Sequence, residues 1–313
     1  MQLFTYRSDT QTRTARLIGL LGVDLMRAAH AYLQSHSLSA GEGDKPLPSL
    51  VDLARLGPDE LLLVKESTDW VIQTSQEFDT TPQKEKIVFE FNKMTLLAPI
   101  PRPGKVIGIG GNYPEKAQAN KPEYPTVFLK PSSGVIGDQQ PVVIPKNAKH
   151  VACEVELAVV IGKKARNISK KDAYSVIAGF TAANDIGDRV LEKRTSQWTS
   201  GKMFDTFTPL GPVMVTPDEF DAACDKKLTA CINDKPVQLG SLDQMFFNVS
   251  ELISYLSTLT TLEPGDVILT GSPKTMNGEP NPVYKLKPGD TFEVGIEPFC
   301  SMCNTLIAES QAA

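Results

Sequence analysis

The sequence has few residues of the kinds that identify several large protein classes. It contains three histidines, two tryptophans and five cysteines in 313 residues. No run of eighteen apolar residues is present, so the sequence predicts no membrane-spanning helix. The first twenty residues lack the positive start, apolar middle and small-residue cleavage site of a secretory signal. We therefore expect a cytoplasmic protein with no membrane partner.

An excess of positive charge is also lacking. Thirty-two lysines and arginines stand against 37 acidic residues, which gives a formal net charge of -5. The two signs are interspersed, so the sequence offers no basic stripe for nucleic acid and no polybasic patch for an anionic membrane. We expect a small-molecule partner and no nucleic acid.

The cysteines fit no zinc motif. Cys300 and Cys303 form a single C-x-x-C pair, and no second pair accompanies it. We interpret this pair as structural or incidental, and an odd number of cysteines fits a reducing compartment.

The length and a hydrophobic content of 41% allow one large core or two unequal ones. A proline-rich crossing between Leu96 and Gly104 predicts a domain boundary near residue 98. The predicted domains are a small one over residues 1–97 and a large one over residues 98–313. In the small domain, the spacing of apolar residues predicts strands over 3–6 and 16–21, and helices over 26–34 and 60–76.

The most informative stretch runs from Cys153 to Gly162. It has the β-branched and aliphatic composition of a buried strand, with Glu154 and Glu156 near its start. Residues two apart on a strand share a face, which puts these acids about 6.5 to 7 Å apart at Cα. Either the strand opens to solvent there, or a hard divalent cation balances the two charges.

A third acid strengthens the metal hypothesis. Residues 178–185 predict another strand, and it ends at Asp185. Three carboxylates can hold one Mg²⁺ and leave positions free for water and substrate.

Motifs over residues 95–300 resemble the fumarylacetoacetate hydrolase family in their order and spacing. The residues that carry the resemblance are Gly111-Asn112-Tyr113, Phe128-Leu129-Lys130-Pro131, Glu154 to Gly162, Asn184-Asp185, Gln197-Trp198, Gly201-Lys202, Phe204 to Pro212 and Leu262 to Pro273. This resemblance implies an α+β fold, a mixed β-sandwich roll whose mouth holds Mg²⁺ or Mn²⁺, usually in a homodimer.

The resemblance also assigns site residues. Glu154, Glu156 and Asp185 match the metal ligands, and Lys202 matches the lysine beside the metal. Lys202 would stabilise the negative charge of an enolate or, if desolvated, act as a base. Thr270 matches the threonine that binds the carboxylate or oxo group of the substrate. The remaining substrate-binding candidates are Ser272, Gln197, Arg189, Asn112 and Tyr113.

The chain departs from the family pattern in the proline-flanked segment 114–125, which we expect to form a lid or a surface flap. Hydrolytic members carry a histidine and a glutamate there that activate water, but Lys116 and Ala119 stand in those places. An exposed lysine, with a pKa of about 10.4, is mostly protonated at neutral pH. The sequence therefore disfavours water activation by the usual route. Lys116 remains a catalytic candidate in the histidine position, and Lys274 and Met276 should narrow or recharge the pocket.

Three hypotheses remain open. The first is a metal-dependent enzyme that cleaves a carbon–carbon bond of a small 2-oxo acid or β-dicarbonyl compound, as acylpyruvate hydrolases do. The second is a keto–enol tautomerase, isomerase or decarboxylase on an oxo acid such as oxaloacetate, since these reactions need no activated water. The third is a metal-binding paralogue without catalytic activity.

Overall fold

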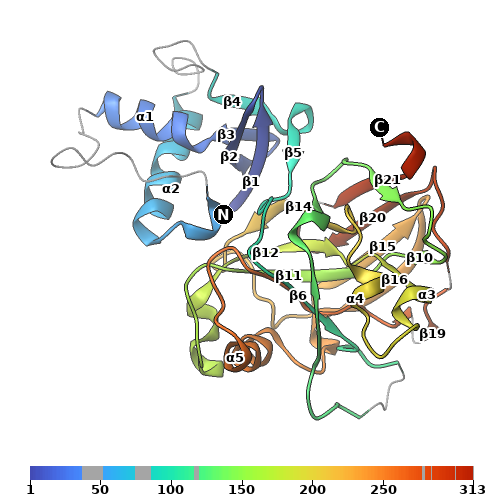
Figure 1. Ribbon diagram of the computed structural model, residues 1–313. Helices are drawn as coiled ribbons and strands as arrows, with labels where there is room; N and C mark the ends of the chain where they lie inside the picture. The colour runs from blue at the N-terminus through green and yellow to red at the C-terminus, as the bar shows by residue number, and fades with distance from the viewer. Residues whose placement is uncertain are drawn as a thin grey trace.

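The computed structural model describes residues 1–36, 52–74, 86–115, 120–276, 279–282, 284–299 and 301–312. In Figure 1 the described N-terminal part, coloured blue to teal, forms a smaller lobe, and the described remainder of the chain forms a larger body beneath it. The protein has mixed sheets with few helices, which confirms the predicted α+β class. Lys116, Ala119 and Cys300 lie outside the described residues, so the predictions made for them stay predictions.

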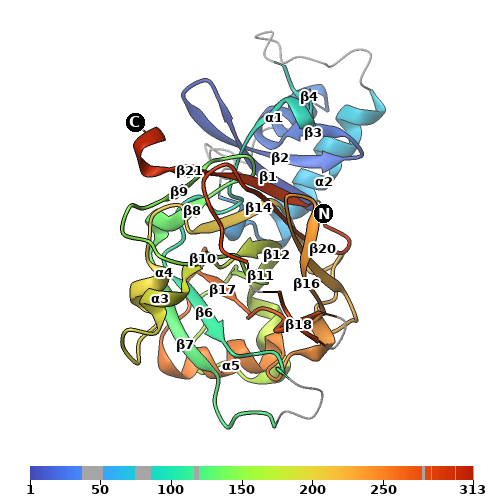
Figure 2. The ribbon, with the colours of Figure 1, turned by 90° about the vertical axis from the view of Figure 1, so that its right-hand side faces the viewer.

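A large twelve-stranded sheet runs through both lobes, as Figures 1 and 2 show. Two of its strands lie off the main path: β5 (Thr95–Leu97) pairs with β1 (Gln2–Ser8), and β8 (Val135–Ile136) pairs with β14 (Thr208–Val215). The main path is β4 (Val88–Glu90), β3 (Leu21–Asp24), β2 (Gln11–Ile18), β1 (Gln2–Ser8), β14 (Thr208–Val215), β12 (Ile177–Asn184), β11 (Val155–Ile161), β17 (Val267–Leu269), β6 (Val106–Gly110) and β7 (Thr126–Lys130).

A second sheet of five strands packs against the larger one. Its order is β16 (Lys235–Ser241), β15 (Lys227–Ile232), β20 (Thr291–Ile296), β21 (Met302–Ala308) and β9 (Val142–Ile144). Leu157 of β11, Ala230 of β15 and Val294 of β20 belong to one buried cluster between the two sheets. Helix α5 (Val249–Leu259) adds its apolar face to the same core. Two short strand pairs, β10 (Val151–Ala152) with β13 (Gly187–Asp188) and β18 (Thr275–Met276) with β19 (Glu279–Pro280), complete the body.

Strand β11 is buried on both faces, as its unbroken apolar run predicts. Leu157 and Val159 point into the core between the sheets. Ala158 and Val160 belong to a second cluster on the opposite face. That cluster includes residues of α1 (Leu25–Ser35) and α2 (Pro58–Gln73), so the small lobe covers β11 beyond Glu156, on the face that Glu156 shares with Ala158 and Val160.

The small lobe matches the predicted elements with one correction. The strand predicted over 16–21 is interrupted, because β2 ends at Ile18 and β3 begins at Leu21. Gly19 makes the turn between them with a φ of 61°, a conformation that glycine adopts without strain. The sheet continues from this lobe into the body through Gln2 and Leu3 of β1, which pair with β14. The domain boundary at residue 98 stays a prediction.

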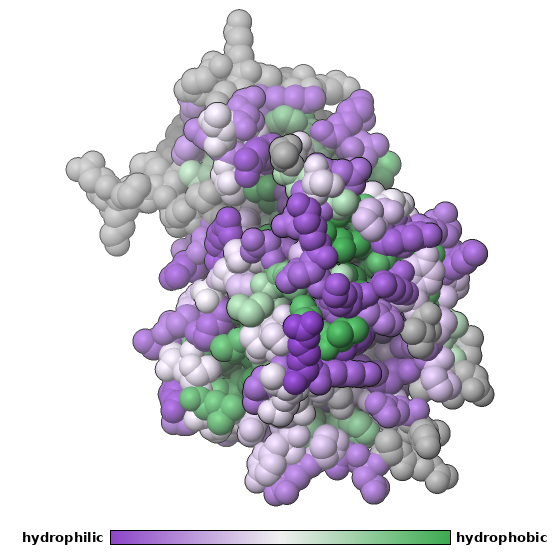
Figure 3. Space-filling model, turned by 45° about the vertical axis from the view of Figure 1, so that its right-hand side comes forward, coloured by the Kyte–Doolittle hydropathy of each residue, from purple (hydrophilic) through white to green (hydrophobic). Residues whose placement is uncertain are grey.

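Hydrophilic residues dominate the face shown in Figure 3, and the hydrophobic residues on it form separate patches. No helix among the described residues is long and apolar enough to cross a membrane.

Asp24 links β3, α1 and the neighbouring strands of the small lobe. Its carboxylate accepts hydrogen bonds from the Tyr6 hydroxyl at 2.6 Å and from the Arg13 Nε at 2.6 Å. It also accepts from the backbone N–H of Arg27 at 2.8 Å, which caps the first turn of α1. Only 1% of this residue is exposed, so the three donors depend on one buried anion.

Replacing the buried Asp24 carboxylate should make the small lobe less stable. We expect Asp24→Ala to lower the free energy of unfolding by about 3 kcal/mol, because Arg13 loses its partner and α1 loses its cap. Urea denaturation followed by circular dichroism measures the change. The exposed Asp225, changed to Asn, is the control and should alter stability by less than about 0.5 kcal/mol. Equal stability of the two variants would contradict this role of Asp24.

Candidate metal centre and active site

The pairing of β11 with β12 brings the predicted metal ligands together. Val155 lies opposite Asn184, so the residue before β11, Glu154, faces the residue after β12, Asp185. The Asp185 N–H donates to the Glu154 carbonyl at 2.9 Å, and the Glu154 N–H donates to Asn184 Oδ1 at 2.9 Å. Glu156 follows on the same face of β11. One carboxylate oxygen from each of the three acids lies within 4.8 Å of the others.

All three acids are almost fully buried, with exposed fractions of 5%, 2% and 1% for Glu154, Glu156 and Asp185. Buried carboxylates need cationic or hydrogen-bonding partners. Lys202 Nζ supplies one, at 2.6 Å from both Glu154 Oε2 and Asp185 Oδ2. Lys130 Nζ lies 2.7 Å from Asp185 Oδ1 and also donates to the Ile186 carbonyl at 2.9 Å.

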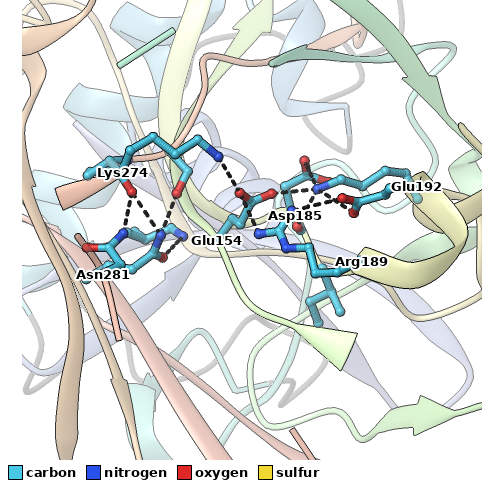
Figure 4. A network of polar contacts seen from close by, with 12 residues as sticks. Glu154, Asp185, Arg189, Glu192, Lys274 and Asn281 are labelled. Carbon is cyan, nitrogen blue, oxygen red and sulfur yellow. Dashed lines mark hydrogen bonds and ion pairs between the residues drawn. The ribbon is translucent and has the colours of Figure 1, made fainter. Parts of the chain in front are cut away.

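Two more cations approach Glu154 from the side away from Lys202. Arg189 Nη2 lies 2.8 Å from Glu154 Oε1, and Lys274 Nζ lies 3.2 Å from the same oxygen. Figure 4 shows Lys274 and Arg189 reaching this carboxylate from different elements. Arg189 also binds Glu192, with Nη1 3.0 Å from Glu192 Oε2. These contacts orient the Glu154 carboxylate with three cations.

The cations divide unequally between the two glutamates. Burial favours the neutral form of both, but Lys202, Arg189 and Lys274 outweigh it at Glu154 and hold the pKa of that carboxyl well below its usual range. At Glu156, burial and repulsion by Asp185 and Glu154 raise the pKa well above the usual range. Glu156 is thus the acid of the triad that lacks a paired cation among the described residues.

Lys202 keeps its proton in this environment. Burial lowers the pKa of a lysine, but here Asp185 and Glu154 outweigh burial and raise it. The sequence-based suggestion that Lys202 acts as a base is therefore not supported, whereas its suggested role as a fixed positive charge fits the geometry. Only 2% of Lys202 is exposed.

The oxygen atoms of the triad fit a hard divalent cation. Asp185 Oδ1 is buried and accepts no hydrogen bond from the described residues, although it lies in ion-pair range of Lys130. Glu156 accepts one hydrogen bond, from the Gly271 N–H to Oε2 at 2.8 Å. Several carboxylate oxygens thus face one another with too few hydrogen-bond donors. Mg²⁺ and Mn²⁺ prefer such oxygen ligands.

A cavity of about 80 Å³ opens on the triad. Phe128 and Trp198 form an aromatic wall, with ring centroids 5.9 Å apart. Gly110 leaves room for Trp198, because a Cβ at this position would lie 1.8 Å from the indole ring. The other lining residues are Ile109, Gly111, Glu154, Glu156, Asp185, Arg189, Glu192, Lys202, Ser272 and Lys274.

Two of the predicted substrate-binding residues, Arg189 and Ser272, line this cavity, and the others lie elsewhere. Thr270 is fully buried, and its hydroxyl donates to the Leu157 carbonyl at 3.0 Å. The Asn112 amide donates to the Thr270 carbonyl at 2.7 Å and therefore braces the loop after β17. Substrate contact through either side chain stays a prediction.

Tyr113 and Gln197 also lie off the cavity wall. Tyr113 is 2% exposed, its hydroxyl has no hydrogen-bond partner among the described residues, and burial raises its pKa. Gln197 is exposed at the start of the segment that carries Trp198. Their predicted contacts with substrate likewise stay predictions.

Three residues at the site were not predicted from the sequence: Lys130, Glu192 and Trp198. Lys130 had a detectable signal, because strand alternation puts it on the same face as Phe128, with only Leu129 between them pointing outward. The sequence signal for Glu192 was weaker. It lies three residues after Arg189, so the two side chains are neighbours on a helical turn.

This chain is similar to known proteins over most of its length. The family model described as fumarylacetoacetate (FAA) hydrolase C-terminal matches residues 105–307. Mitochondrial oxaloacetate tautomerase Fahd2a of Rattus norvegicus is 39% identical over 69% of this chain and 70% of its own. The 2,4-didehydro-3-deoxy-L-rhamnonate hydrolase of a Sphingomonas strain is 42% identical over 64% of this chain and 72% of its own.

Among solved structures, 5-carboxymethyl-2-hydroxymuconate delta-isomerase from Mycobacterium smegmatis superposes with a TM-score of 0.72. It is 26% identical, and the match covers 99% of this chain and all of that one. The shared fold and the match to the family model over most of the large lobe lead to one conclusion: this chain belongs to the fumarylacetoacetate hydrolase family.

Proposed function

We propose that this protein is a Mg²⁺- or Mn²⁺-dependent enzyme that interconverts the keto and enol forms of a small 2-oxo acid. The observation that supports this best is the position of Glu192 beside Lys202. Glu192 Oε1 is buried on the cavity wall, has no hydrogen-bond partner among the described residues and lies 3.8 Å from Lys202 Nζ. A free carboxylate oxygen next to a fixed positive charge suits the removal of a proton from carbon.

Glu154, Glu156 and Asp185 would hold the ion. When bound there, a divalent cation polarises the oxo group of a 2-oxo acid and so makes the neighbouring C–H bond more acidic. Lys130, Lys202 and Arg189 keep the ligand carboxylates in place through the ion pairs described above.

The proposed reaction moves one proton. Glu192 takes the proton from carbon 3 of the keto acid, and the electron pair of that C–H bond becomes the carbon–carbon double bond of the enol. The Lys202 ammonium, whose three N–H groups are held by Glu154 and Asp185, acts as a fixed positive charge that stabilises the oxygen that gains negative charge, which lowers the barrier. The proton is returned to that oxygen or to the carbon, so no water or second substrate is consumed.

This reaction also fits the altered lid. It needs no activated water, and the histidine and glutamate that activate water in hydrolytic members are replaced by Lys116 and Ala119. The relative from Rattus norvegicus, named as an oxaloacetate tautomerase, supports the same choice. We therefore rank tautomerisation above the carbon–carbon hydrolysis that the sequence analysis placed first.

Hydrolysis of a carbon–carbon bond is the second candidate. The 42% identical relative from Sphingomonas, named as a hydrolase, favours it. Cleavage next to a 2-oxo group also develops an enolate, so Lys202 would serve both reactions in the same way.

Metal binding should depend on the triad. We expect Asp185→Asn to weaken Mn²⁺ binding by more than about 100-fold, since it removes a charged ligand at almost unchanged size. Isothermal titration calorimetry with MnCl₂ measures the affinity, and Asp225→Asn is the matched exposed control. If Asp185→Asn binds Mn²⁺ as tightly as the unmodified protein, the ion does not bind at the triad.

Proton transfer should depend on Glu192. In D₂O with Mn²⁺, the protein should speed deuterium incorporation at carbon 3 of oxaloacetate, and Glu192→Gln should slow this at least about 100-fold. Nuclear magnetic resonance measures the exchange, and the exposed Glu123, changed to Gln, is the control.

The same assay separates the candidates. Release of CO₂ and pyruvate from oxaloacetate would show a decarboxylase, and release of two acids from an acylpyruvate would show a hydrolase. Mn²⁺ binding with neither exchange nor product would contradict the proposed function and favour a paralogue without activity.

A further inference from the structure

A second and larger cavity, of about 500 Å³, adjoins the triad cavity. Glu154, Arg189 and Lys274 line both cavities, so they form the junction between them. Figure 4 shows Lys274 and Arg189 meeting at Glu154 from different parts of the chain. The larger volume falls in the range of about 300 to 1,000 Å³ that is usual for ligand pockets. We call this second cavity the outer chamber.

One side of the outer chamber is largely apolar. Ile232 at the end of β15 and Val237 on β16 are buried, with 2% and 7% exposed, and both line it. The Tyr284 ring and three prolines from the segment after β17 line it as well. This side can contact an aliphatic or aromatic group.

The side next to the junction is cationic. Lys193, at the end of α3 (Arg189–Glu192), lines the outer chamber together with Arg189, Lys274 and His150. The acids on its walls are Glu115 and Glu154, and Glu154 already has Lys202 as a partner. The chamber thus offers an anionic group more positive than negative charge.

Of the three cations at Glu154, Lys274 is the farthest from the carboxylate and the most exposed. Arg189 holds the same oxygen at the shorter distance of 2.8 Å, against 3.2 Å for Lys274, and Lys202 holds the other oxygen at 2.6 Å. The Lys274 side chain is 33% exposed, unlike the buried Lys202. Because Glu154 is already paired with Arg189 and Lys202, the partly exposed Lys274 ammonium is available to pair with a ligand.

We propose that the outer chamber binds the substituent of the 2-oxo acid, and that Lys274 selects substrates whose substituent ends in an acidic group after an apolar stem. This inference rests on the proposed function, because it assumes that the 2-oxo acid end of the substrate occupies the triad cavity. The stem contacts Ile232 and Val237, and the terminal carboxylate pairs with Lys274.

A matched pair of ligands tests the proposal. 2-Oxoadipate and 2-oxohexanoate have the same length, and only the first ends in a carboxylate. In the presence of Mn²⁺, calorimetry should show about tenfold tighter binding of 2-oxoadipate, as expected for one charged hydrogen bond. Lys274→Met should bring the ratio of the two affinities close to one. The exposed Lys287, changed to Met, should keep the ratio of the unmodified protein.

A second variant tests the chamber itself. Val237→Trp should fill it and weaken both six-carbon ligands at least tenfold relative to oxalate, which has no substituent. If oxalate binds but the six-carbon ligands show no difference in the unmodified protein or the variants, the chamber proposal is wrong and the proposed function stands. If oxalate does not bind in the presence of Mn²⁺, the triad cavity is not a 2-oxo acid site, and both proposals fail.

Discussion

The site depends on holding three carboxylates close together away from water. Burial of one unpaired charge costs several kcal/mol, so the chain must compensate each acid. The antiparallel pairing of β11 and β12 fixes the positions of Glu154 and Asp185 through backbone hydrogen bonds. Lys202 and Lys130 then neutralise the two acids from within the body of the protein. The strand pairing sets the geometry, and the lysines offset the free-energy cost of burying the charged carboxylates.

The cations are divided unevenly among the three acids, and this uneven division has a chemical consequence. Glu154 interacts with three cations, whereas Glu156 faces two other acids and no paired cation among the described residues. A divalent ion at the triad would relieve that repulsion. Glu192 lies just outside the triad, and its Oε1 accepts no hydrogen bond from the described residues, so in the proposed reaction metal ligation and proton transfer fall to different carboxylates. The outer chamber begins at the same junction, where Lys274 reaches Glu154.

The sequence predicts the parts of this site that follow from local periodicity. Glu154 and Glu156 share a face because strand side chains alternate, and Asp185 could be placed because it ends the next predicted strand. The turn at Gly19 was missed because the apolar run on both sides of it hides the break. Cationic partners such as Lys130 come from strands distant in sequence, and their contacts depend on the register of the whole sheet. Family motifs located Thr270 and Asn112, but motif position does not give side-chain direction. Both side chains donate hydrogen bonds to backbone carbonyls, and their contact with substrate stays a prediction.

The central claim is that one divalent ion is shared by the three buried acids. A crystal of the protein soaked in MnCl₂, with diffraction recorded at a wavelength where manganese scatters anomalously, tests this most directly. The account predicts one strong anomalous peak within about 2.2 Å of an oxygen from each of Glu154, Glu156 and Asp185. A fully soaked crystal with no peak among these carboxylates, or with manganese bound only elsewhere, would contradict it.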